Sequence, residues 1–269
     1  MNKYTTFLAI FVLLFSVSFA IELIQPIKAQ LKGAETIDLG KIGPGQTIFV
    51  SIEPKVITGG KFDKGGQYDQ AVVTALPPNW KAKNSKIYGN PLQVEITADE
   101  NAKEGVYSAE ITTIDQNYGE QLNNVSFKVR VQITKDVLET SITPTEITVG
   151  PDQPARYVIT ITNKGSAADV FEVSSEGIKR WEYKKPVYVA AQSTKTVFYE
   201  ITNREEESYK VTLKVKSKAS SLIQKDTNIT LNVRTDILAD YKATNNGVLI
   251  FPFFENIVYS FAGLLSNLF

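Results

Sequence analysis

Strict alternation of apolar and polar residues runs through the middle of this chain, and it limits the folds that the chain can adopt. Between residues 125 and 134, every odd position holds valine, phenylalanine or isoleucine, and every even position holds a polar or charged residue. Apolar residues at every second position recur at 48–52, 157–161, 197–201 and 229–233. Successive side chains of a β-strand point to opposite faces, so the pattern predicts antiparallel strands with one buried and one solvated face.

Turn sequences separate the alternating segments at the spacing expected of β-sandwich hairpins. They are Gly-Pro-Gly at 43–45, Asn-Tyr-Gly at 117–119 and Asn-Lys-Gly at 163–165. No long helical pattern interrupts residues 35–234, and this excludes an α/β fold.

The strand pattern stops near Thr134 and resumes near Glu139, which indicates a domain boundary around residue 136. Each side of this boundary has about the ~100 residues of an immunoglobulin-like sandwich. We therefore predict an all-β chain with two tandem immunoglobulin-like antiparallel β-sandwiches. The first covers 30–136, with a loop insertion at 54–70, and the second covers 137–235.

Residues 1–29 are typical of a signal peptide or an N-terminal anchor. A short positive region precedes an unbroken apolar core at 7–15, and Ser18-Phe19-Ala20 provides the small residues that a signal peptidase requires. Ala29 is a second cleavage candidate. The alternative is an uncleaved anchor at 7–24, which is near the lower length limit for crossing a bilayer. Both interpretations place the bulk of the chain outside the cytoplasm, in the cell envelope or at the extracellular face of the cytoplasmic membrane.

The C-terminus is unusually apolar for the end of a β-sandwich protein. A polar linker at 236–247 leads into residues 248–269, whose single charged residue is Glu255. After Pro252, apolar residues recur at the spacing of one face of a helix. These candidate contact residues are Phe254, Ile257, Val258, Phe261, Leu264, Leu265 and Leu268.

Three interpretations of this amphipathic helix remain open. It packs as the last helix of the second domain, it enters a membrane or its interface, or its small residues dock on a helix of a partner. The linker before it favours contact with a membrane lipid or with a membrane-protein partner. The segment carries no lysine or arginine, so hydrophobic insertion or protein contact explains it better than attraction to anionic lipid.

The composition excludes much catalytic chemistry. The chain has no cysteine and no histidine, so thiol centres, Cys/His metal sites and imidazole-dependent triads are impossible. Carboxylate pairs for glycoside hydrolysis are conceivable at 99–100, at 205–207, or at Glu172 with Glu176, but adjacent acids in polar runs are usually solvated turns. We expect no enzyme activity, no catalytic residues and no cofactor.

The insertion at 54–70 contains two Gly-Gly pairs and two aspartates, Asp63 and Asp69. No Gly-Lys-Ser/Thr follows the glycines, and the aspartates lack EF-hand spacing, so neither a phosphate loop nor a metal site is expected. We expect a mobile surface loop that serves as a contact for a partner.

Basic residues gather in the second half of the chain, around the Lys179–Lys185 segment and at alternate positions from Lys210 to Lys218. Lysines along a strand commonly protect a sheet edge from aggregation, so a solvated basic face is expected. Binding of an acidic surface glycan is the alternative. Nucleic acid is not expected as a partner, because 29 basic residues balance 29 acidic ones and the chain is exported.

The two tryptophans, Trp80 and Trp181, occupy similar positions in the two halves. The ordinary expectation is a buried core aromatic. The alternative is an exposed platform on which a sugar ring stacks, as in a secreted carbohydrate-binding or adhesion module.

Two glycosylation triplets begin at Asn124 and Asn228. Both asparagines fall on the outward phase of expected strands, so modification is sterically allowed at either site.

In the second half, a strand ends in the Asn163-Lys164-Gly165 turn, another strand follows at 169–173, then the lone Trp181 and a strand at 187–189. This order of features resembles that of immunoglobulin-like domains of archaeal and bacterial envelope proteins, of the CARDB-like and NPCBM-associated types. The first half shows a looser version, with Trp80 after Pro77-Pro78. The resemblance implies a non-catalytic adhesion, spacer or accessory module, and it carries no catalytic residues to transfer.

Overall fold

The computed structural model describes residues 21–31, 33–116, 121–179, 181–245 and 252–266, without the side chains of residues 243–245 and 264–266. The chain divides into two compact units between Thr134 and Lys135, close to the boundary expected near residue 136. We call residues 1–134 domain 1 and residues 135–269 domain 2. The expected signal core and the cleavage site at Ser18-Phe19-Ala20 lie outside the described residues.

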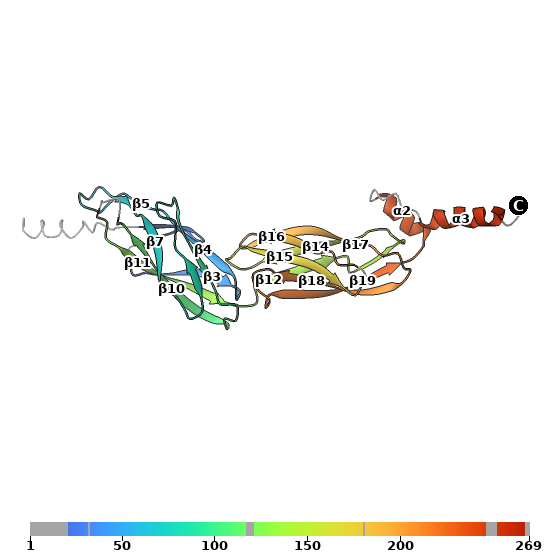
Figure 1. Ribbon diagram of the computed structural model, residues 1–269, viewed down its shortest axis with the longest axis horizontal. Coiled ribbons are helices and arrows are strands. Elements are labelled where there is room, and N and C mark those ends of the chain that lie inside the picture. Colours follow the sequence, from blue (N-terminus) through green and yellow to red (C-terminus); the bar gives the residue numbers. More distant parts are fainter. Residues whose placement is uncertain (1–20, 32, 117–120, 180, 246–251, 267–269) are drawn as a thin grey trace, which may run out of the picture. The chain divides into compact units, whose positions relative to one another are not determined.

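Domain 1 contains two main sheets (Figure 1). The first has the strand order β2-β1-β4-β9-β8, and the second has the order β3-β11-β10-β7. The strands are β1 (Ile21–Gln25), β2 (Ala29–Leu31), β3 (Thr36–Ile42), β4 (Thr47–Ile52), β7 (Gln70–Ala75), β8 (Lys81–Lys83), β9 (Leu92–Thr97), β10 (Gly105–Ile114) and β11 (Val125–Ile133). All pairings are antiparallel except that of β3 with β11, which is parallel.

Domain 1 begins earlier than expected. Ile21 and Leu23 of β1 are buried in the core, and β1 pairs with both β2 and β4. Residues 21–29 were included in the expected leader because Ala29 was a second cleavage candidate, whereas cleavage after Ser18-Phe19-Ala20 leaves them in the domain. In the structure these side chains alternate between buried and exposed, which is the pattern of a sandwich strand. Cleavage after Ala29 or an anchor extending to Ile24 would therefore take strand β1 out of the sandwich.

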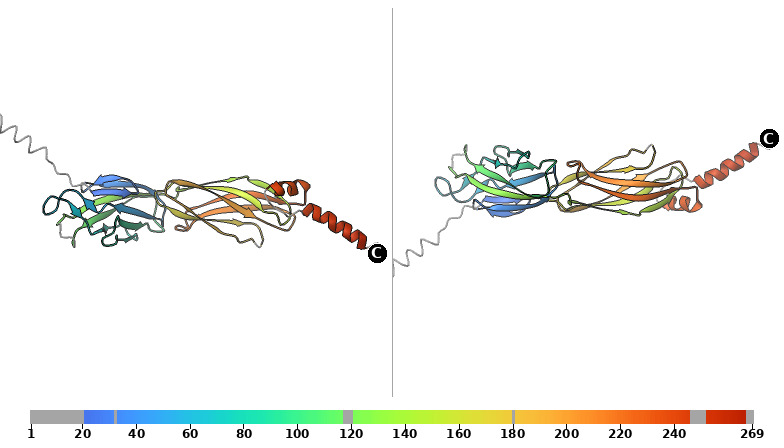
Figure 2. Two further views of the ribbon diagram at one scale, coloured as in Figure 1. Left: turned by 90° about the horizontal axis from the view of Figure 1, so that it is seen from above. Right: turned by 90° about the horizontal axis from the view of Figure 1, so that it is seen from below.

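Domain 2 is a sandwich of two facing sheets (Figures 1 and 2). The three-stranded sheet has the order β12-β14-β17, and the five-stranded sheet has the order β13-β19-β18-β15-β16. The strands are β12 (Leu138–Thr143), β13 (Glu146–Val149), β14 (Ala155–Asn163), β15 (Asp169–Glu176), β16 (Lys185–Val189), β17 (Ser193–Ile201), β18 (Ser208–Ser217) and β19 (Gln224–Val233).

The core of domain 2 is one continuous apolar cluster between its sheets. Tyr157, Phe171 and Tyr199 are its largest fully buried side chains, and the inward residues of β18 and β19 complete it. The alternation in the sequence assigned these faces correctly, since Val211, Leu213 and Val215 are buried. The fold class predicted from the alternation is confirmed.

The insertion of domain 1 is more ordered than the expected mobile loop. It forms a small hairpin of its own from β5 (Lys55–Val56) and β6 (Gly66–Gln67). Gly65 has a positive φ of 75°, and a Cβ at this position would lie 2.0 Å from the carbonyl oxygen of Val56. A glycine is therefore required to close the hairpin.

The expected linker at 236–247 is mostly a helix. Helix α2 (Ile237–Asn245) follows Asp236, whose carboxylate accepts the Leu238 amide at 3.0 Å and so caps the first turn. Ala239 and Asp240 of α2 are buried, because α2 packs against β13. Helix α3 (Pro252–Ser266) then contains the expected amphipathic segment.

Candidate functional site

The apolar face of α3 is not covered by the rest of domain 2. Every described side chain from Phe254 to Gly263 is exposed. The exposed fractions of the predicted contact residues Phe254, Ile257, Val258 and Phe261 lie between 43% and 68%. Packing of these four side chains into the domain is therefore not observed. Leu264 and Leu265 lie in the last turn of α3, and their side chains, like all of Leu268, lie outside the described part of the chain.

The N-terminal end of α3, in contrast, is fixed to domain 2 by a buried polar chain. The Asp240 carboxylate accepts the Phe253 amide at 3.1 Å and the side-chain amide of Gln153 at 2.9 Å. Gln153 in turn accepts the Gly150 amide at 2.8 Å, in the turn between β13 and β14. A carboxylate at the first turn also interacts favourably with the helix dipole. These bonds join α3 to the sandwich through α2.

Helix α2 adds apolar surface that the sequence analysis missed. Ile237, Leu238 and Tyr241 are exposed, whereas Ala239 and Asp240 face the sandwich. The signal that could have revealed this helix is Asp236, an N-cap residue directly before Ile-Leu-Ala. The described parts of α2 and α3 thus present eight large exposed hydrophobic side chains, with Tyr259 among them.

Neither helix has the length and apolarity that a single crossing of a bilayer demands; this holds for all helices in the described ranges.

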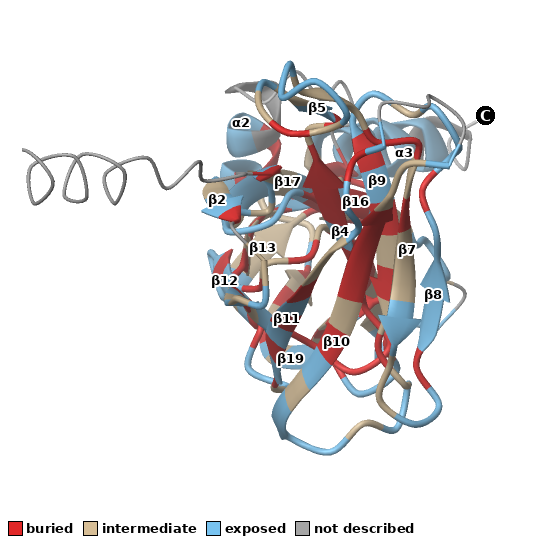
Figure 3. Ribbon diagram, turned by 90° about the vertical axis from the view of Figure 1, so that its left-hand side faces the viewer, coloured by how far each residue is buried: buried red, intermediate tan, exposed pale blue. Residues whose placement is uncertain are grey.

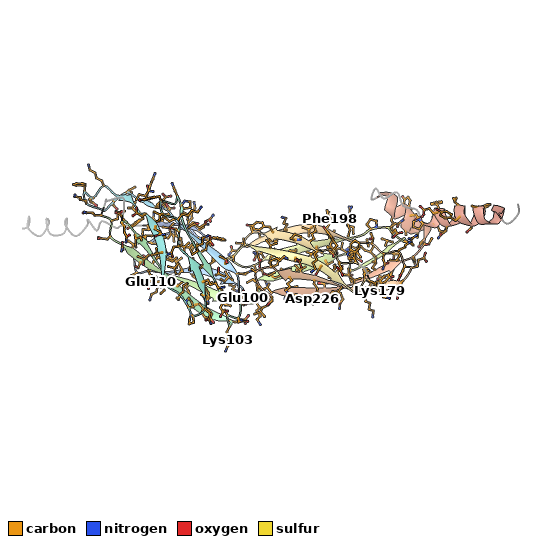
Figure 4. All side chains as sticks on the ribbon, in the orientation of Figure 1. Glu100, Lys103, Glu110, Lys179, Phe198 and Asp226 are labelled. Atoms are coloured by element: carbon orange, nitrogen blue, oxygen red, sulfur yellow. The ribbon has the colours of Figure 1, made fainter. Side chains whose placement is uncertain are left out.

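Trp181 lies at a second surface of interest, the outer face of the five-stranded sheet of domain 2. A groove of about 680 Å³ lies over β15 and β18 beside the segment that connects β15 to β16. We call it the Trp181 groove; its lining includes Glu172, Ser174, Glu176, Trp181, Lys214 and Lys216. Trp181 also lines a neighbouring hollow of about 350 Å³ together with Tyr183 and Phe198 (Phe198 is labelled in Figure 4).

The segment that carries Trp181 is attached to the sandwich at both ends. At its start, Gly177 has φ +101°, and a Cβ there would lie 2.5 Å from the Lys210 carbonyl oxygen. Ile178 is buried in the core. At its end, the Tyr199 hydroxyl donates to the Tyr183 carbonyl at 2.6 Å. These contacts fix the position of Trp181 over the sheet.

The indole of Trp181 is partly buried against the core, and its N–H is shielded from solvent without a partner in hydrogen-bonding geometry. The N–H nevertheless lies near enough to the Tyr199 hydroxyl to favour the ionised form of that phenol. Burial outweighs this effect and raises the pKa of Tyr199 above its ordinary value.

Three of the four lysines along β18 and directly after it, Lys210, Lys216 and Lys218, are exposed as expected, but they do not protect a sheet edge. β18 is a central strand, with β19 on one side and β15 on the other. Register places β18 opposite the glutamates of β15, so Lys214 pairs with Glu176 at 2.6 Å and Lys218 pairs with Glu172 at 2.7 Å. Two of the four lysines are therefore paired with carboxylates of the neighbouring strand.

Glu172, one member of the candidate acid pair with Glu176, has a pKa shifted the wrong way for proton donation. The hydrogen bond from Lys218, together with the charges of Lys184 and Lys216, lowers the pKa of Glu172. A general acid at neutral pH needs the opposite shift. These carboxylates act as ion-pair partners.

Trp80 differs from Trp181. Its side chain is 8% exposed and lies against Tyr107, with ring centroids 5.4 Å apart and planes inclined at 37°. The stacking platform considered for Trp80 is therefore wrong, and Trp80 is a core residue. The short strand β8 after it is fully exposed, as its pale blue colour in Figure 3 shows.

Both aspartates of the insertion accept hydrogen bonds from backbone amides. Asp63 accepts the Gly59 amide at 2.9 Å, and buried Asp69 accepts the Gln116 amide at 2.5 Å. No group of three acidic side chains able to hold a metal ion occurs among the residues that the structure describes. The hairpin does expose two large apolar side chains, Ile57 at 91% and Phe62 at 73%, which suits the expected contact with a partner.

Both glycosylation triplets are accessible. Asn124 is exposed directly before β11, and Asn228 is exposed on β19, where its side-chain oxygen accepts the Thr212 hydroxyl at 3.0 Å. Their use stays a prediction.

Comparison with known proteins finds distant similarity to solved structures. No family model and no curated protein matches the chain. A chimeric titin Z1Z2 is 9% identical with a TM-score of 0.36, over 82% of this chain and 100% of that chain. The fibronectin(III)-like modules of Clostridium thermocellum CbhA are 10% identical with a TM-score of 0.28, over 80% and 94%.

The Yersinia pseudotuberculosis adhesin InvE is also similar, at 14% identity and a TM-score of 0.30, over 82% of this chain and 62% of that chain. The resemblance to CARDB-like and NPCBM-associated domains stays a prediction.

Proposed function

We propose that this chain is a non-catalytic, exported surface protein whose two β-sandwiches are attached to a membrane, or to a protein within it, through the C-terminal helices. The observation that carries this proposal is the uncovered apolar face of α3. Burial of a large apolar side chain stabilises by roughly 1.5–3 kcal/mol, so four such side chains left in water form a strong potential contact.

The way α3 begins supports attachment over packing within the domain. Asp240 and Gln153 fix the first turn of α3, while the following two turns touch nothing that would bury their apolar side chains. A helix held at one end presents its free surface without a large loss of entropy on binding. In this proposal the β5–β6 hairpin of domain 1 and the outer face of domain 2 serve as surfaces for recognition of a partner.

The proposal is tested by flotation of the full chain with neutral phosphatidylcholine vesicles. The triple variant Phe254→Ser, Val258→Ser, Phe261→Ser should lower vesicle binding by well over about tenfold, since 1.4 kcal/mol corresponds to a factor of ten. The matched control is Ile57→Ser with Phe62→Ser, which removes exposed apolar side chains from domain 1 and should leave binding unchanged. Both variants keep the N-terminal segment, so a contribution from it cancels.

The two modes of attachment give different results. Direct insertion requires binding to neutral vesicles that is insensitive to salt, because the described part of α3 has no basic residue. If vesicles fail to bind but host membranes retain the chain until the triple substitution is made, the partner is a membrane protein. Equal retention of the wild type and the triple variant in both assays contradicts attachment through α3.

A further inference from the structure

The Trp181 groove combines an aromatic wall with a floor of polar side chains. The floor is the outer face of β15 and β18. It is formed by Glu172, Ser174 and Glu176 of β15 and by Lys214 and Lys216 of β18. Its volume of about 680 Å³ lies within the range of small-ligand sites. Trp181 forms part of the wall here and also of the adjacent hollow with Tyr183 and Phe198.

The charges of the groove cancel. Its lining carries three carboxylates, Glu172, Glu176 and Glu182, and three ammonium groups, Lys184, Lys214 and Lys216. Ion pairs join Glu176 to Lys214, and Glu172 to Lys184 at 3.9 Å. An anionic polymer would gain little from such a surface, and a cation would gain equally little. The lining favours a neutral ligand rich in hydrogen-bond donors and acceptors.

The groove is also built on rigid elements. β15 is paired on both sides, with β16 and β18, and Glu172 faces Lys216 while Ser174 faces Lys214 across the ladder. Gly177, Ile178 and the Tyr199–Tyr183 hydrogen bond hold the segment bearing Trp181. A site whose side chains are already fixed loses little entropy on binding.

We propose that the Trp181 groove binds a neutral oligosaccharide. The C–H face of one sugar ring packs on the indole of Trp181, and its hydroxyls exchange hydrogen bonds with the paired glutamates, lysines and serines of β15 and β18. Sugar hydroxyls both donate and accept, which matches a lining that contains both kinds of group. Because Trp181 borders both hollows, a chain of several sugars uses the site more fully than a monosaccharide does. The proposal is independent of α3 and of membrane attachment.

Fluorescence of Trp181 provides a direct test. In the full chain with Trp80→Phe, Trp181 is the sole tryptophan, so its emission reports on the groove alone. The probes are cellohexaose, mannohexaose and N-acetylchitohexaose as neutral ligands, and hexagalacturonate as the anionic one. We expect at least one neutral hexasaccharide to change the emission saturably at micromolar to millimolar concentration, and hexagalacturonate to bind more weakly.

Variants assign the binding to the groove, measured by calorimetry with the best neutral probe. Trp181→Ala should lower the affinity by roughly tenfold or more, as truncation of a central aromatic contact does. Trp181→Phe keeps a smaller aromatic surface and should retain an intermediate affinity. Tyr188→Ala is the matched control, because Tyr188 is an exposed aromatic residue of β16 that lines neither hollow.

Three results would overturn the proposal. They are the absence of a saturable change with every neutral hexasaccharide, tighter binding of hexagalacturonate than of the best neutral probe, and equal loss of affinity in Trp181→Ala and Tyr188→Ala. Circular dichroism and thermal melting of each variant establish that it is folded. The Trp181→Phe variant keeps the test decisive if Trp181→Ala fails to fold.

Discussion

Trp80 and Trp181 precede corresponding edge strands in the two sandwiches, yet one is a core residue and the other borders a groove. In domain 2 the strand after the tryptophan, β16, stays in the same sheet and pairs with β15. In domain 1 the corresponding strand, β8, crosses to the other sheet and pairs with β9. Apart from β2 and the β5–β6 hairpin, which occur in domain 1, the other described strands are ordered in the same way in both domains.

The different pairing of β8 and β16 explains why Trp80 is buried and Trp181 borders a groove. In domain 1, where β8 pairs with β9, Trp80 is buried against Tyr107. In domain 2, where β16 pairs with β15, Trp181 is only partly buried against the core and borders two hollows. Similar sequence positions therefore acquire different roles through the pairing of one short strand.

The largest expected effect is that of Trp80→Ala on domain 1. Truncation of a buried tryptophan costs about 3–5 kcal/mol, whereas Trp181→Ala should cost domain 2 about 1 kcal/mol because its indole is only partly buried. Urea denaturation monitored by hydrogen exchange of peptides from each domain measures the two separately. Equal losses in the two domains would contradict the difference in burial.

The second effect is alkaline destabilisation, which should be stronger in domain 2. Burial raises the pKa of Tyr157 and Tyr199 in domain 2 and of Tyr68 in domain 1. A buried phenol that keeps its proton contributes stability that is fully present below the unfolded pKa near 10 and is lost as the pH rises above it. Domain 2 has more tyrosines with a raised pKa, so between pH 9 and pH 11 we expect its free energy of unfolding to fall by more than that of domain 1.

Single-tryptophan variants resolve this difference. Trp181→Phe leaves a reporter in domain 1, and Trp80→Phe leaves one in domain 2, so urea titrations at pH 9 and pH 11 give the free energy of unfolding of each domain. Parallel decreases in the two domains would indicate that the buried tyrosines do not dominate the alkaline response.

The third effect compares alanine substitutions of Gly177 and Gly65, two glycines with positive φ that lie against a carbonyl oxygen in different parts of the molecule. Gly177→Ala places a Cβ against the Lys210 carbonyl at a positive φ, and we expect a loss of about 1–3 kcal/mol together with a shift in Trp181 emission. Gly65→Ala creates an even closer contact, 2.0 Å against 2.5 Å, in the separate β5–β6 hairpin. It should disturb that hairpin, with little effect on the free energy of unfolding of domain 1. Hydrogen exchange distinguishes a local from a global response.

The sequence predicted the strands well because their alternation is local information. β11, β14, β18 and β19 were all expected from the period-two pattern, and their inward residues are buried. The start of β1 was missed because Ile21 and Leu23 continue an apolar run, so the leader and the first strand cannot be separated by hydropathy.

The chemistry of the surfaces was harder to predict because it depends on pairings distant in sequence. The lysines of β18 were expected to form a basic face, but the glutamates that pair with two of them come from β15, about 40 residues earlier along the chain. Asp240 looked like part of a polar linker, although Gln153, 87 positions earlier, makes it a buried helix anchor. The exposure of Trp181 likewise depends on whether the next strand pairs with β15 or with β17, which residue types alone do not decide.

The smallest expected effect separates two exposed carboxyl groups whose pKa values are lowered for different reasons. In domain 1, Asp38 is stabilised first by the Gly40 amide and then by Arg130, whereas in domain 2 Glu172 depends on Lys218 and the other lysines around it. Each group contributes stability that is present above its unfolded pKa and is lost as the pH falls through its folded pKa. Salt screens the lysine charges but leaves a neutral amide donor in place.

Raising the sodium chloride concentration should therefore move the pKa of Glu172 upward, toward its ordinary value, by more than that of Asp38. Carbon-13 NMR titrations of the two carboxyl groups at low and high salt measure both pKa values in one sample. Lys218→Met should reproduce the effect of salt on Glu172 alone, and Arg130→Met should move Asp38 only in part because the Gly40 amide remains. Equal salt responses of the two groups would mean that their neighbouring charges, and not the backbone donor, determine both pKa values.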